Sequence, residues 1–323
     1  MNPTGGLARR KTVLDQLAPA NVLVLDSGNA LFANAGVATE AEKARAKFIF
    51  GVMQKLGTRV MAVGQRDLSA GLPFLEELAK SSSKLKLLSA NLQRGGKQVF
   101  EGGVVIDAGG VKVGLVGLTA VGPVAPDKDV AGLPTLEAAR AALKALGPRD
   151  VTIVLAATTY ADGMQLATEL GTEVDFVIQS GEFRGTQPAQ RMTDTSALLF
   201  ASAQKGQALA KVQLKLGSGK GPFVDLSLAD RDQQQVDFLN SQVKTLEERL
   251  SAAKDKSTTG DLKKTLGELK QRQKELSASV AKKVAAGAKT VKLEWVMLGS
   301  SVADDPKLKA EVLKYEPSYA GSH

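Results

Sequence analysis

Two short polar stretches hold the residues whose types and spacing could do chemistry. Asp26 to Asn29 follow an apolar strand predicted over residues 22–25, and Gly64 to Asp67 follow a strand predicted over residues 59–63. In an open α/β sheet, ligands and catalytic groups gather where a strand ends in a small-residue loop. Carboxylates and amides at such a place can bind metal ions or move protons. We therefore take these two loops as the candidate site.

The histidine and cysteine contents limit this chemistry. His323 is the one histidine of the chain, and there is no cysteine. Histidine is the usual general base near neutral pH and the commonest metal ligand. The composition therefore excludes an active site that this chain alone builds on internal imidazoles. It also excludes disulfides, thiolate metal sites and cysteine nucleophiles within these residues.

The overall composition predicts a soluble globular protein. The chain has 323 residues, of which 43% are apolar, and a formal net charge of +8. This length suits one large domain or a domain with an appendage. No run approaches the roughly 18 to 20 apolar residues that a membrane helix needs, and the N-terminus lacks the apolar core of a signal peptide. The chain itself therefore carries no indication of its location.

Strands and helices alternate up to about residue 180, which predicts an α/β layered fold. Helices are expected over residues 40–56, 71–80, 136–146 and 163–170. Further strands are expected over residues 85–88, 104–118, 151–155 and 174–178. From Ala197 to Leu228 the pattern changes to successive strands without helices, which we expect to be antiparallel additions to the sheet.

Residues 232–286 show the heptad spacing of a coiled coil. Apolar residues recur at steps of three and four in two arms, with Gln273 filling one position: Val236, Leu239, Val243, Leu246 and Leu250, then Leu262, Leu266, Leu269, Leu276 and Val280. The breaker Ser257–Gly260 between them predicts a helical hairpin. Residues 232–292 hold 13 Lys or Arg against 8 Asp or Glu. This charge fits either a solvated surface or contact with an anionic or protein partner.

The pattern thus predicts four parts. Residues 1–230 form an α/β domain, and residues 231–287 form the helical hairpin inserted in it. Residues 288–303 contain a strand that returns to the core domain, because residues 290–298 alternate apolar and polar side chains. Residues 304–323 form a polar tail with one helical turn around residues 307–314.

Six segments together resemble a known family in order and spacing. They are GGLARRKTVLDQL, VLVLDSGNALF, AVGQRDLSAGLPFLEELA with LLSANL, VKVGLVGLT, DVTIVLAATTYADGMQLATEL and VDFVIQS. They resemble the N-terminal domain of calcineurin-like metallophosphoesterases of the 5'-nucleotidase type, over about residues 5 to 220. The resemblance implies a two-sheet α/β/β/α sandwich with a two-metal site at the strand ends. Such metals clamp the attacking and leaving oxygens of a phosphoester.

The resemblance also shows where the family's metal ligands are missing. The position of the metal-bridging aspartate falls on Asn29, and that of the metal-binding asparagine falls on Gln65. Arg66 stands at the catalytic histidine and places a fixed positive charge where a general acid would titrate. The family's opening Asp-x-His strand would lie upstream of Met1.

Two later histidine blocks of the family are replaced as well. The first falls on Ala156 or Ala157. The second lies within Gln179–Arg184, where its two histidines fall on Gly181 and Phe183 or, after a slip of one residue, on Glu182 and Arg184. Neither alignment restores a histidine.

These replacements predict a catalytically degenerate domain that serves as a binding or scaffold module. No cofactor or metal is predicted, and a protein partner is expected to contact the hairpin over residues 232–286. The alternative is a metal-dependent phosphoester hydrolase. In it, Asp26, Asp67 and Glu182 hold magnesium, or residues outside this chain complete the site.

A third hypothesis needs no metal. Arg66 and the backbone amides around Gly28 and Gly64 would hold an anion such as phosphate. Against it stands a structural role, in which Arg66 forms an ion pair with Asp67 or Asp26.

Two further features bear on substrate and location. With 4% aromatic residues and a single tryptophan, Trp295, on a predicted strand, no platform for stacking a nucleotide base is evident. Residues 315–323, YEPSYAGSH, resemble the segment before a haem-attachment motif in bacterial multihaem cytochromes, some of which are fused to metallophosphoesterase-like domains. That resemblance implies the periplasm or cell envelope, whereas an ordinary polar tail would imply nothing.

Overall fold

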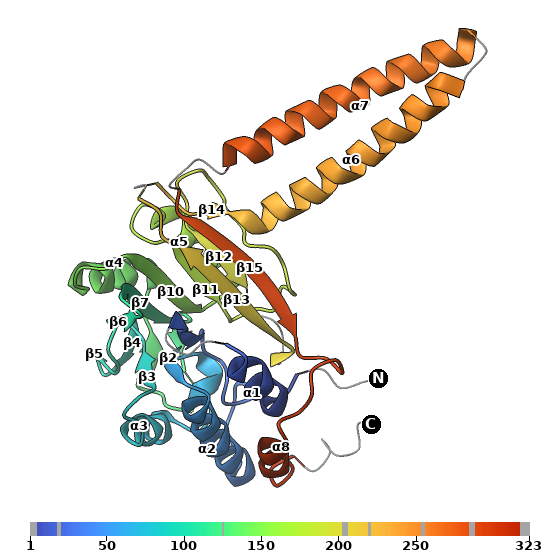
Figure 1. The fold of residues 1–323 in the computed structure, drawn as a ribbon. Coiled ribbons are helices and arrows are strands. Elements are labelled where there is room, and N and C mark those ends of the chain that lie inside the picture. Colours follow the sequence, from blue (N-terminus) through green and yellow to red (C-terminus); the bar gives the residue numbers. More distant parts are fainter. Residues whose placement is uncertain are drawn as a thin grey trace. The chain divides into compact units, whose positions relative to one another are not determined.

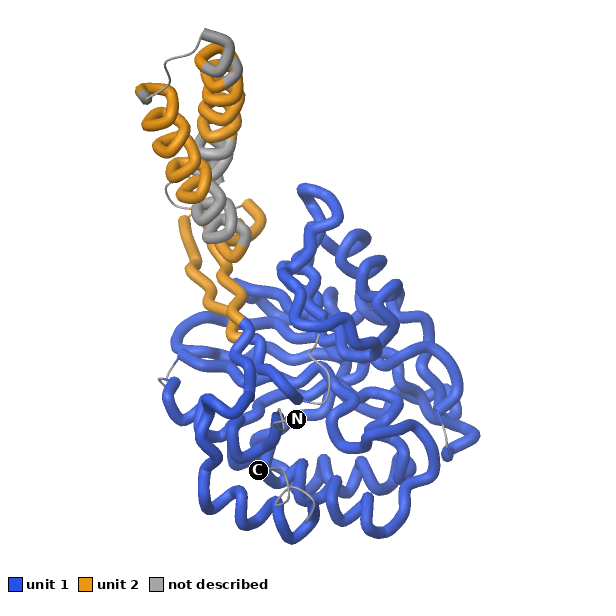
Figure 2. Tube along the Cα trace, turned by 90° about the vertical axis from the view of Figure 1, so that its right-hand side faces the viewer, with its two compact units in different colours: residues 1–210, 295–323 blue, residues 211–294 orange. Residues whose placement is uncertain are grey.

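The computed structural model describes residues 5–17, 21–124, 126–201, 206–218, 221–252, 256–283 and 288–316. The chain divides into two compact units (Figure 2). Unit 1 comprises residues 1–210 and 295–323, and unit 2 comprises residues 211–294. The first boundary between the units falls near residue 210, whereas the sequence predicted it at residue 230. Residues 224–225 pair with residues 290–291, and both segments belong to unit 2.

Unit 1 is built on two sheets. The first contains three parallel strands in the order β1-β2-β3: β1 (Val24–Asp26), β2 (Thr58–Ala62) and β3 (Lys86–Leu88). The second has the order β12-β11-β10-β7-β6: β6 (Gly103–Ala108), β7 (Val111–Thr119), β10 (Val151–Ala157), β11 (Phe176–Gln179) and β12 (Leu198–Ala201). The two sheets face each other, since β2 contacts both β7 and β10. A third sheet contains four short strands, β4 (Leu92–Arg94), β5 (Lys97–Gln98), β8 (Gly122–Pro123) and β9 (Val130–Gly132).

Helices cover the outer faces of the first and the second sheet (Figure 1). On the first sheet, α2 (Glu40–Lys55) packs against β2, and its start is fixed by a capping box between Thr39 and Glu42. Next to it, α3 (Leu72–Lys80) contributes Leu75 to the same apolar core. On the second sheet, α4 (Thr135–Ala145) packs against β7, and α5 (Tyr160–Glu169) packs against β11 and β12. The predicted α/β/β/α sandwich is therefore confirmed.

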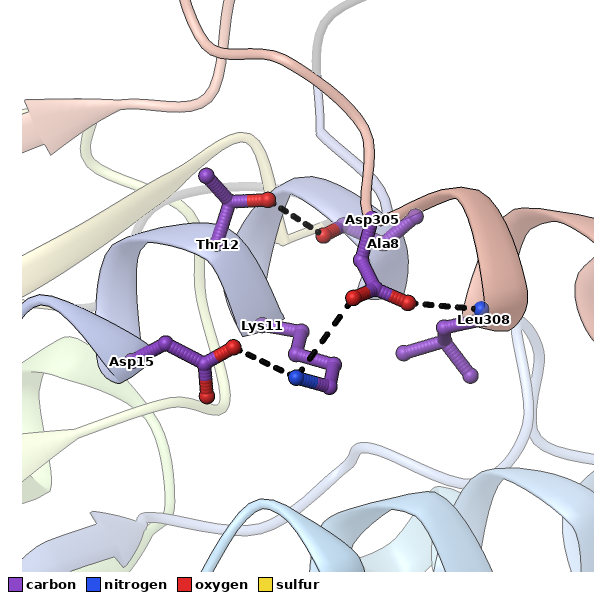
Figure 3. A network of polar contacts seen from close by, with 6 residues as sticks. All are labelled: Ala8, Lys11, Thr12, Asp15, Asp305 and Leu308. Carbon is purple, nitrogen blue, oxygen red and sulfur yellow. Dashed lines mark hydrogen bonds and ion pairs between the residues drawn. The ribbon is translucent and has the colours of Figure 1, made fainter.

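The two ends of unit 1 meet at a pair of helices, α1 (Leu7–Asp15) and α8 (Pro306–Val312) (Figure 3). Asp305 caps α8 by accepting the backbone N–H of Leu308 at 2.8 Å, and it forms an ion pair with Lys11 of α1 at 3.5 Å. Lys11 also pairs with Asp15 one turn along its own helix. The predicted helical turn around residues 307–314 is thus α8, which docks on α1. Residues 317–323, with most of the segment that resembles a haem-attachment flank, lie outside the described residues.

The prediction for Ala197 to Leu228 was wrong in two respects. Strand β12 runs parallel to β11, because the chain crosses over between them. Of the two later strands, β13 (Ala208–Lys215) is formed, but β14 covers only Val224–Asp225 and pairs parallel with β15 (Thr290–Met297). The chain then becomes helical at Leu226, where the Asp225 carboxylate accepts the backbone N–H of Ser227 at 2.8 Å. Such a cap favours a helix start over continuation of the strand.

Unit 2 contains the predicted pair of helices, α6 (Leu226–Ala252) and α7 (Lys256–Lys283), which lie side by side (Figure 1). Val236, Leu239, Val243 and Leu266 are buried, as their spacing predicted. Gln273 donates its side-chain N–H to Asn240 of the other helix, and Lys270 forms an ion pair with Glu247 at 2.7 Å. The side chains of Leu276 and Val280 lie outside the described residues.

Ser257–Gly260 does not break the hairpin as predicted, because α7 already includes these residues. Serine and threonine favour helix starts, so the run marks where the second helix begins. Residues 253–255, between the helices, are outside the described part of the chain. Within that described part, no helix is long and apolar enough to cross a membrane.

Candidate functional site

The loops that follow four parallel strands meet at one edge of unit 1. A Cβ atom built on Gly28, after β1, would lie 2.6 Å from the carbonyl oxygen of Ala62 at the end of β2 and 3.0 Å from the Cβ of Ala157 at the end of β10. The side-chain amide of Asn29 reaches the carbonyl of Ser180, which follows β11, at 3.5 Å. The two polar loops expected from the sequence are therefore adjacent, as strand ends in such a sheet should be.

Asp67 is the central residue of this arrangement. It lies in the short 3-10 helix η2 (Gln65–Leu68) and is completely buried. Its carboxylate accepts four backbone N–H groups, from Asn29 at 2.7 Å, Ala30 at 2.8 Å, Leu31 at 2.9 Å and Gly64 at 2.9 Å. Hydrogen bonds to an ionised acceptor are among the strong ones in proteins. Asp67 therefore holds the loop after β1 against the loop after β2.

Burial shapes the protonation of both carboxylates. Removal from solvent raises the pKa of Asp67 to about 6, the hydrogen bonds from Leu31, Gly64 and Asn29 oppose this rise, and the charge of Asp26 adds to it. Burial likewise raises the pKa of Asp26, against the opposing effects of the Arg10 charge and the Gly28 N–H. Asp26 accepts that N–H at 2.9 Å. The two carboxylates thus lie near enough to influence each other.

Asn29 fills the space between the two loops. Its φ of 61° lies in the left-handed region, which asparagine enters more readily than most residues. Its side-chain oxygen accepts the backbone N–H of Arg66 at 3.1 Å. A Cβ atom on Gly64 would stand only 2.4 Å from that oxygen, so the close approach requires glycine at position 64.

Arg66 does not form the ion pair that was considered for it. Its guanidinium donates to the backbone carbonyls of Ala33 and Asn29, each at 3.1 Å. The Asp67 oxygens already accept four N–H groups, so they offer Arg66 no free partner. The amides expected to help Arg66 bind an anion are also engaged, since Gly28 donates to Asp26 and Gly64 donates to Asp67.

The segment after β11 separates into buried and exposed parts. Ser180 is buried and donates its hydroxyl to the carbonyl of Ser27. Gly181 lies so close to Thr158 that a Cβ atom would stand 1.8 Å from the Thr158 oxygen. Glu182 and Phe183 project into solvent, with Phe183 53% exposed. Glu182 therefore does not join Asp26 and Asp67 as the magnesium hypothesis required.

A buried polar cluster beside the site was missed by sequence reasoning. The hydroxyl of Thr119, at the end of β7, donates to the carbonyl of Val63 at 2.7 Å and shares a 2.7 Å hydrogen bond with the hydroxyl of Ser89. Asn91 donates to the Thr119 carbonyl at 2.7 Å and accepts the Thr119 N–H at 2.8 Å. These bonds connect the ends of β2, β3 and β7. Their signal in the sequence was a set of polar residues directly after apolar strands.

Known proteins share this arrangement of elements. No family model matches the chain. A 5'-nucleotidase of Vibrio cholerae serotype O1 is 34% identical over 122 residues, which are 35% of this chain and 21% of that protein. The solved 5'-nucleotidase precursor from Thermus thermophilus superposes with a TM-score of 0.61 and 19% identity, over 99% of this chain and 54% of its own. The chain has the fold of a 5'-nucleotidase-type metallophosphoesterase domain.

A second solved structure agrees with this assignment. The calcineurin-like phosphoesterase YfkN from Bacillus subtilis gives a TM-score of 0.53 and 20% identity, over 68% of this chain and 79% of its own. The resemblance inferred from the sequence is thereby confirmed. The chain spans about a fifth of the Vibrio protein and about half of the Thermus protein.

A pair of metal ions does not fit the residues that this domain presents at its strand ends. Asn29, Gln65 and Ala157 offer amides and a methyl group where the family resemblance implies ligands, and Arg66 puts a cation at the position of the catalytic histidine. The Asp67 oxygens accept four N–H groups, and no side chain fits at Gly181 without movement of Thr158. Among the residues whose placement is described, no group of three or more His, Cys, Asp or Glu could hold a metal ion.

Proposed function

We propose that this metallophosphoesterase domain is a binding or scaffold module that does not hydrolyse phosphoesters by two-metal catalysis. The observation that carries the proposal is that Asn29, Gln65 and Ala157 stand where the family resemblance implies metal ligands. The buried carboxylate of Asp67, in the same loop as Gln65, instead joins two loops by four N–H contacts. A metal ligand needs its oxygen lone pairs for the ion, and here backbone donors occupy them. In this proposal, the strand ends serve the fold and the surface serves binding.

The test measures metal content and turnover together. The full-length protein is dialysed against a chelator, incubated with Mn²⁺, Zn²⁺ or Mg²⁺, desalted and analysed by mass spectrometry of the metals. p-Nitrophenyl phosphate reports any phosphomonoesterase activity. We expect far less than one retained ion per chain and no turnover above buffer. Stoichiometric Mn²⁺ or Zn²⁺ with turnover that Asp26→Asn abolishes would overturn the proposal.

One observation favours a second candidate, a metal-dependent phosphoester hydrolase of the 5'-nucleotidase kind. Asp26 accepts the backbone N–H of Gly28 and Asp67 accepts that of the next residue, Asn29, so two carboxylates lie near each other at the strand ends. Ligands from residues outside this chain would have to complete such a site. The same metal and turnover measurements on the full-length protein distinguish the candidates, because only the hydrolase predicts metal-dependent turnover.

We also propose that the hairpin of α6 and α7 binds a protein with an acidic surface. Residues 232–292 carry 13 Lys or Arg against 8 Asp or Glu, and Phe238 on α6 is 60% exposed. An exposed aromatic side chain is a common anchor for a protein contact, and the excess of basic residues on the hairpin would favour an acidic partner. The inward residues Leu239 and Val243 hold the hairpin together and leave this surface available.

Site-specific photocrosslinking in the source organism tests the hairpin proposal. A photoreactive amino acid replaces Phe238 and, as the matched control, Phe183, an exposed phenylalanine in unit 1. We expect a discrete, salt-sensitive crosslinked protein only from position 238. The same pattern from both positions, or none from either, would contradict the proposal.

For the location of the protein, we propose the periplasm or cell envelope, as the family resemblance implies. The resemblance of residues 315–323 to a haem-attachment flank extends this to a multihaem partner domain. Fractionation of source cells and haem staining of the full-length protein test both points. Recovery of the protein in the cytoplasmic fraction would contradict the proposed location, and the absence of haem staining would contradict the multihaem partner domain.

A further inference from the structure

A small pocket lies beside β12, the edge strand of the larger sheet in unit 1. Its volume is about 240 Å³, and its lining includes Tyr160, Arg184, Pro188, Gln190, Leu199 and Ala201. Leu199 and Ala201 are buried and give the pocket an apolar floor, while Arg184 and Gln190 are exposed. None of these residues belongs to the loops around Asp26 and Asp67, although Arg184 ends the segment Gln179–Arg184 in which the family resemblance places a histidine block.

Arg184 is held at this pocket by an aromatic contact. The centre of its guanidinium lies 4.2 Å from the centroid of the Tyr160 ring, within the range of a cation–π interaction. No hydrogen bond or ion pair of Arg184 is found among the described residues. The contact therefore positions the positive charge without using the N–H groups, which can donate to an oxyanion.

Tyr160 is itself well fixed. It is 7% exposed and begins α5 directly after the capping residue Thr159. Its hydroxyl donates to the side-chain oxygen of Gln190 on the opposite segment of the pocket. A ligand would thus meet an arginine whose position is set before binding, which lowers the entropic cost of recognition.

We propose that this pocket binds a small organic anion. A carboxylate or phosphate group would accept hydrogen bonds from the Arg184 guanidinium, whose planar fork matches both groups. An apolar part of the ligand would contact Pro188, Leu199 and Ala201. A volume of about 240 Å³ lies below the usual range for drug-sized ligands, so we expect a compact molecule. This proposal goes beyond the proposed function and does not depend on it.

The chain contains its own reporter for the test. Trp295 is the one tryptophan, and its indole N–H donates to the carbonyl of Gln187 at 2.8 Å. Gln187 also lines the pocket. Occupation of the pocket should therefore change the tryptophan fluorescence, and calorimetry with the same ligands gives a second readout.

The experiment titrates the full-length protein with benzoate, phenyl phosphate and uncharged benzyl alcohol. We expect saturable binding of at least one anion and none of the alcohol; benzoate and phenyl phosphate separate carboxylate from phosphate ligands. Arg184→Ala should weaken binding by about ten- to a hundredfold, because a charge-assisted hydrogen-bonded pair is lost. Arg184→Gln should weaken it similarly and guards against misfolding of the first variant.

Two matched variants complete the design. Arg59→Ala removes an exposed arginine from β2, outside the pocket, and should leave binding unchanged. Tyr160→Phe keeps the aromatic ring and should retain most of the affinity. Three results would overturn the proposal: no saturable binding of either anion, equal binding of benzyl alcohol, or unchanged binding in both folded Arg184 variants.

Discussion

The backbone N–H of Asn29 donates to the carboxylate of Asp67 across 2.7 Å, although the two residues are 38 positions apart in the sequence. Ala30, Leu31 and Gly64 add three more N–H bonds to the same carboxylate. At the strand ends of a metallophosphoesterase fold, the Asp67 carboxylate thus fixes the backbone of two loops. This relationship explains how the loops keep a defined shape with the residues present, and it makes Asp67 the first target for mutation.

Asp67→Asn should destabilise the protein strongly. In the wild-type protein these backbone N–H donors meet carboxylate oxygens, whereas the NH₂ group of asparagine would face some of them. Buried donors left without an acceptor cost about 1–3 kcal/mol each. We expect a loss of about 2–4 kcal/mol in the free energy of unfolding, measured by urea denaturation. Asp129→Asn is the control, because Asp129 is exposed and pairs with exposed Arg94. It should change stability by less than about 1 kcal/mol. Equal effects of the two substitutions would contradict the role given to Asp67.

The pKa of Asp67 predicts a pH dependence of stability. In the folded protein this pKa is about 6, above the ordinary value of 3.8, so the folded state holds the proton more tightly than the unfolded state. The contribution of Asp67 to the free energy of unfolding should therefore fall by up to about 3 kcal/mol as pH rises from about 4 to about 6. Above about pH 6 it should stay constant.

The measurement compares wild type with Asp67→Asn by urea denaturation across this pH range. The raised pKa of Asp26 acts in the same direction, but Asp26 is present in both proteins and largely cancels in the difference. We expect the free energy of unfolding of the wild type minus that of Asp67→Asn to fall with pH. A rise of this difference with pH would show that the four N–H bonds outweigh burial and keep the carboxylate ionised.

Gly64→Ala should also destabilise the protein. The new methyl group would lie 2.4 Å from the side-chain oxygen of Asn29, so Asn29 or the backbone must move. Overpacking of this kind costs about 1–3 kcal/mol. Gly147→Ala is the matched control, since its added methyl group would have no neighbour within 4 Å. Thermal unfolding of both variants makes the comparison, and a fully stable Gly64→Ala protein would show that Asn29 adapts at little cost.

The sequence predicted the layers and the strand ends because these depend on local patterns. Apolar runs ending in polar residues placed Asp26 at the end of β1 and Asp67 after β2, and the parallel sheet brings such ends together. Periodicity alone could not predict the bonds of Asp67. They require the N–H groups of residues 29–31 to converge on one point, which depends on the left-handed conformation of Asn29.

The errors have physical causes as well. One of the two hypotheses for Arg66 paired it with Asp67 or Asp26, but backbone carbonyls of Ala33 and Asn29 occupy its guanidinium. The strand expected through Leu228 stops at Asp225, because that side chain caps a helix. In both cases a side-chain to backbone hydrogen bond outweighed the property that the sequence pattern emphasised.

Thr119→Val tests the buried cluster that joins the two sheets. The threonine hydroxyl donates to the carbonyl of Val63 and bonds the Ser89 hydroxyl, each at 2.7 Å, and the residue is fully buried. Valine keeps the shape but leaves these two groups without that partner, so we expect a loss of about 1–3 kcal/mol in the free energy of unfolding by urea denaturation. Thr168→Val is the control, because Thr168 is exposed and bonds only within its own helix, to the carbonyl of Met164 at 2.9 Å. If both substitutions prove equally mild, the link between the ends of β2 and β7 rests on apolar packing instead of this hydroxyl.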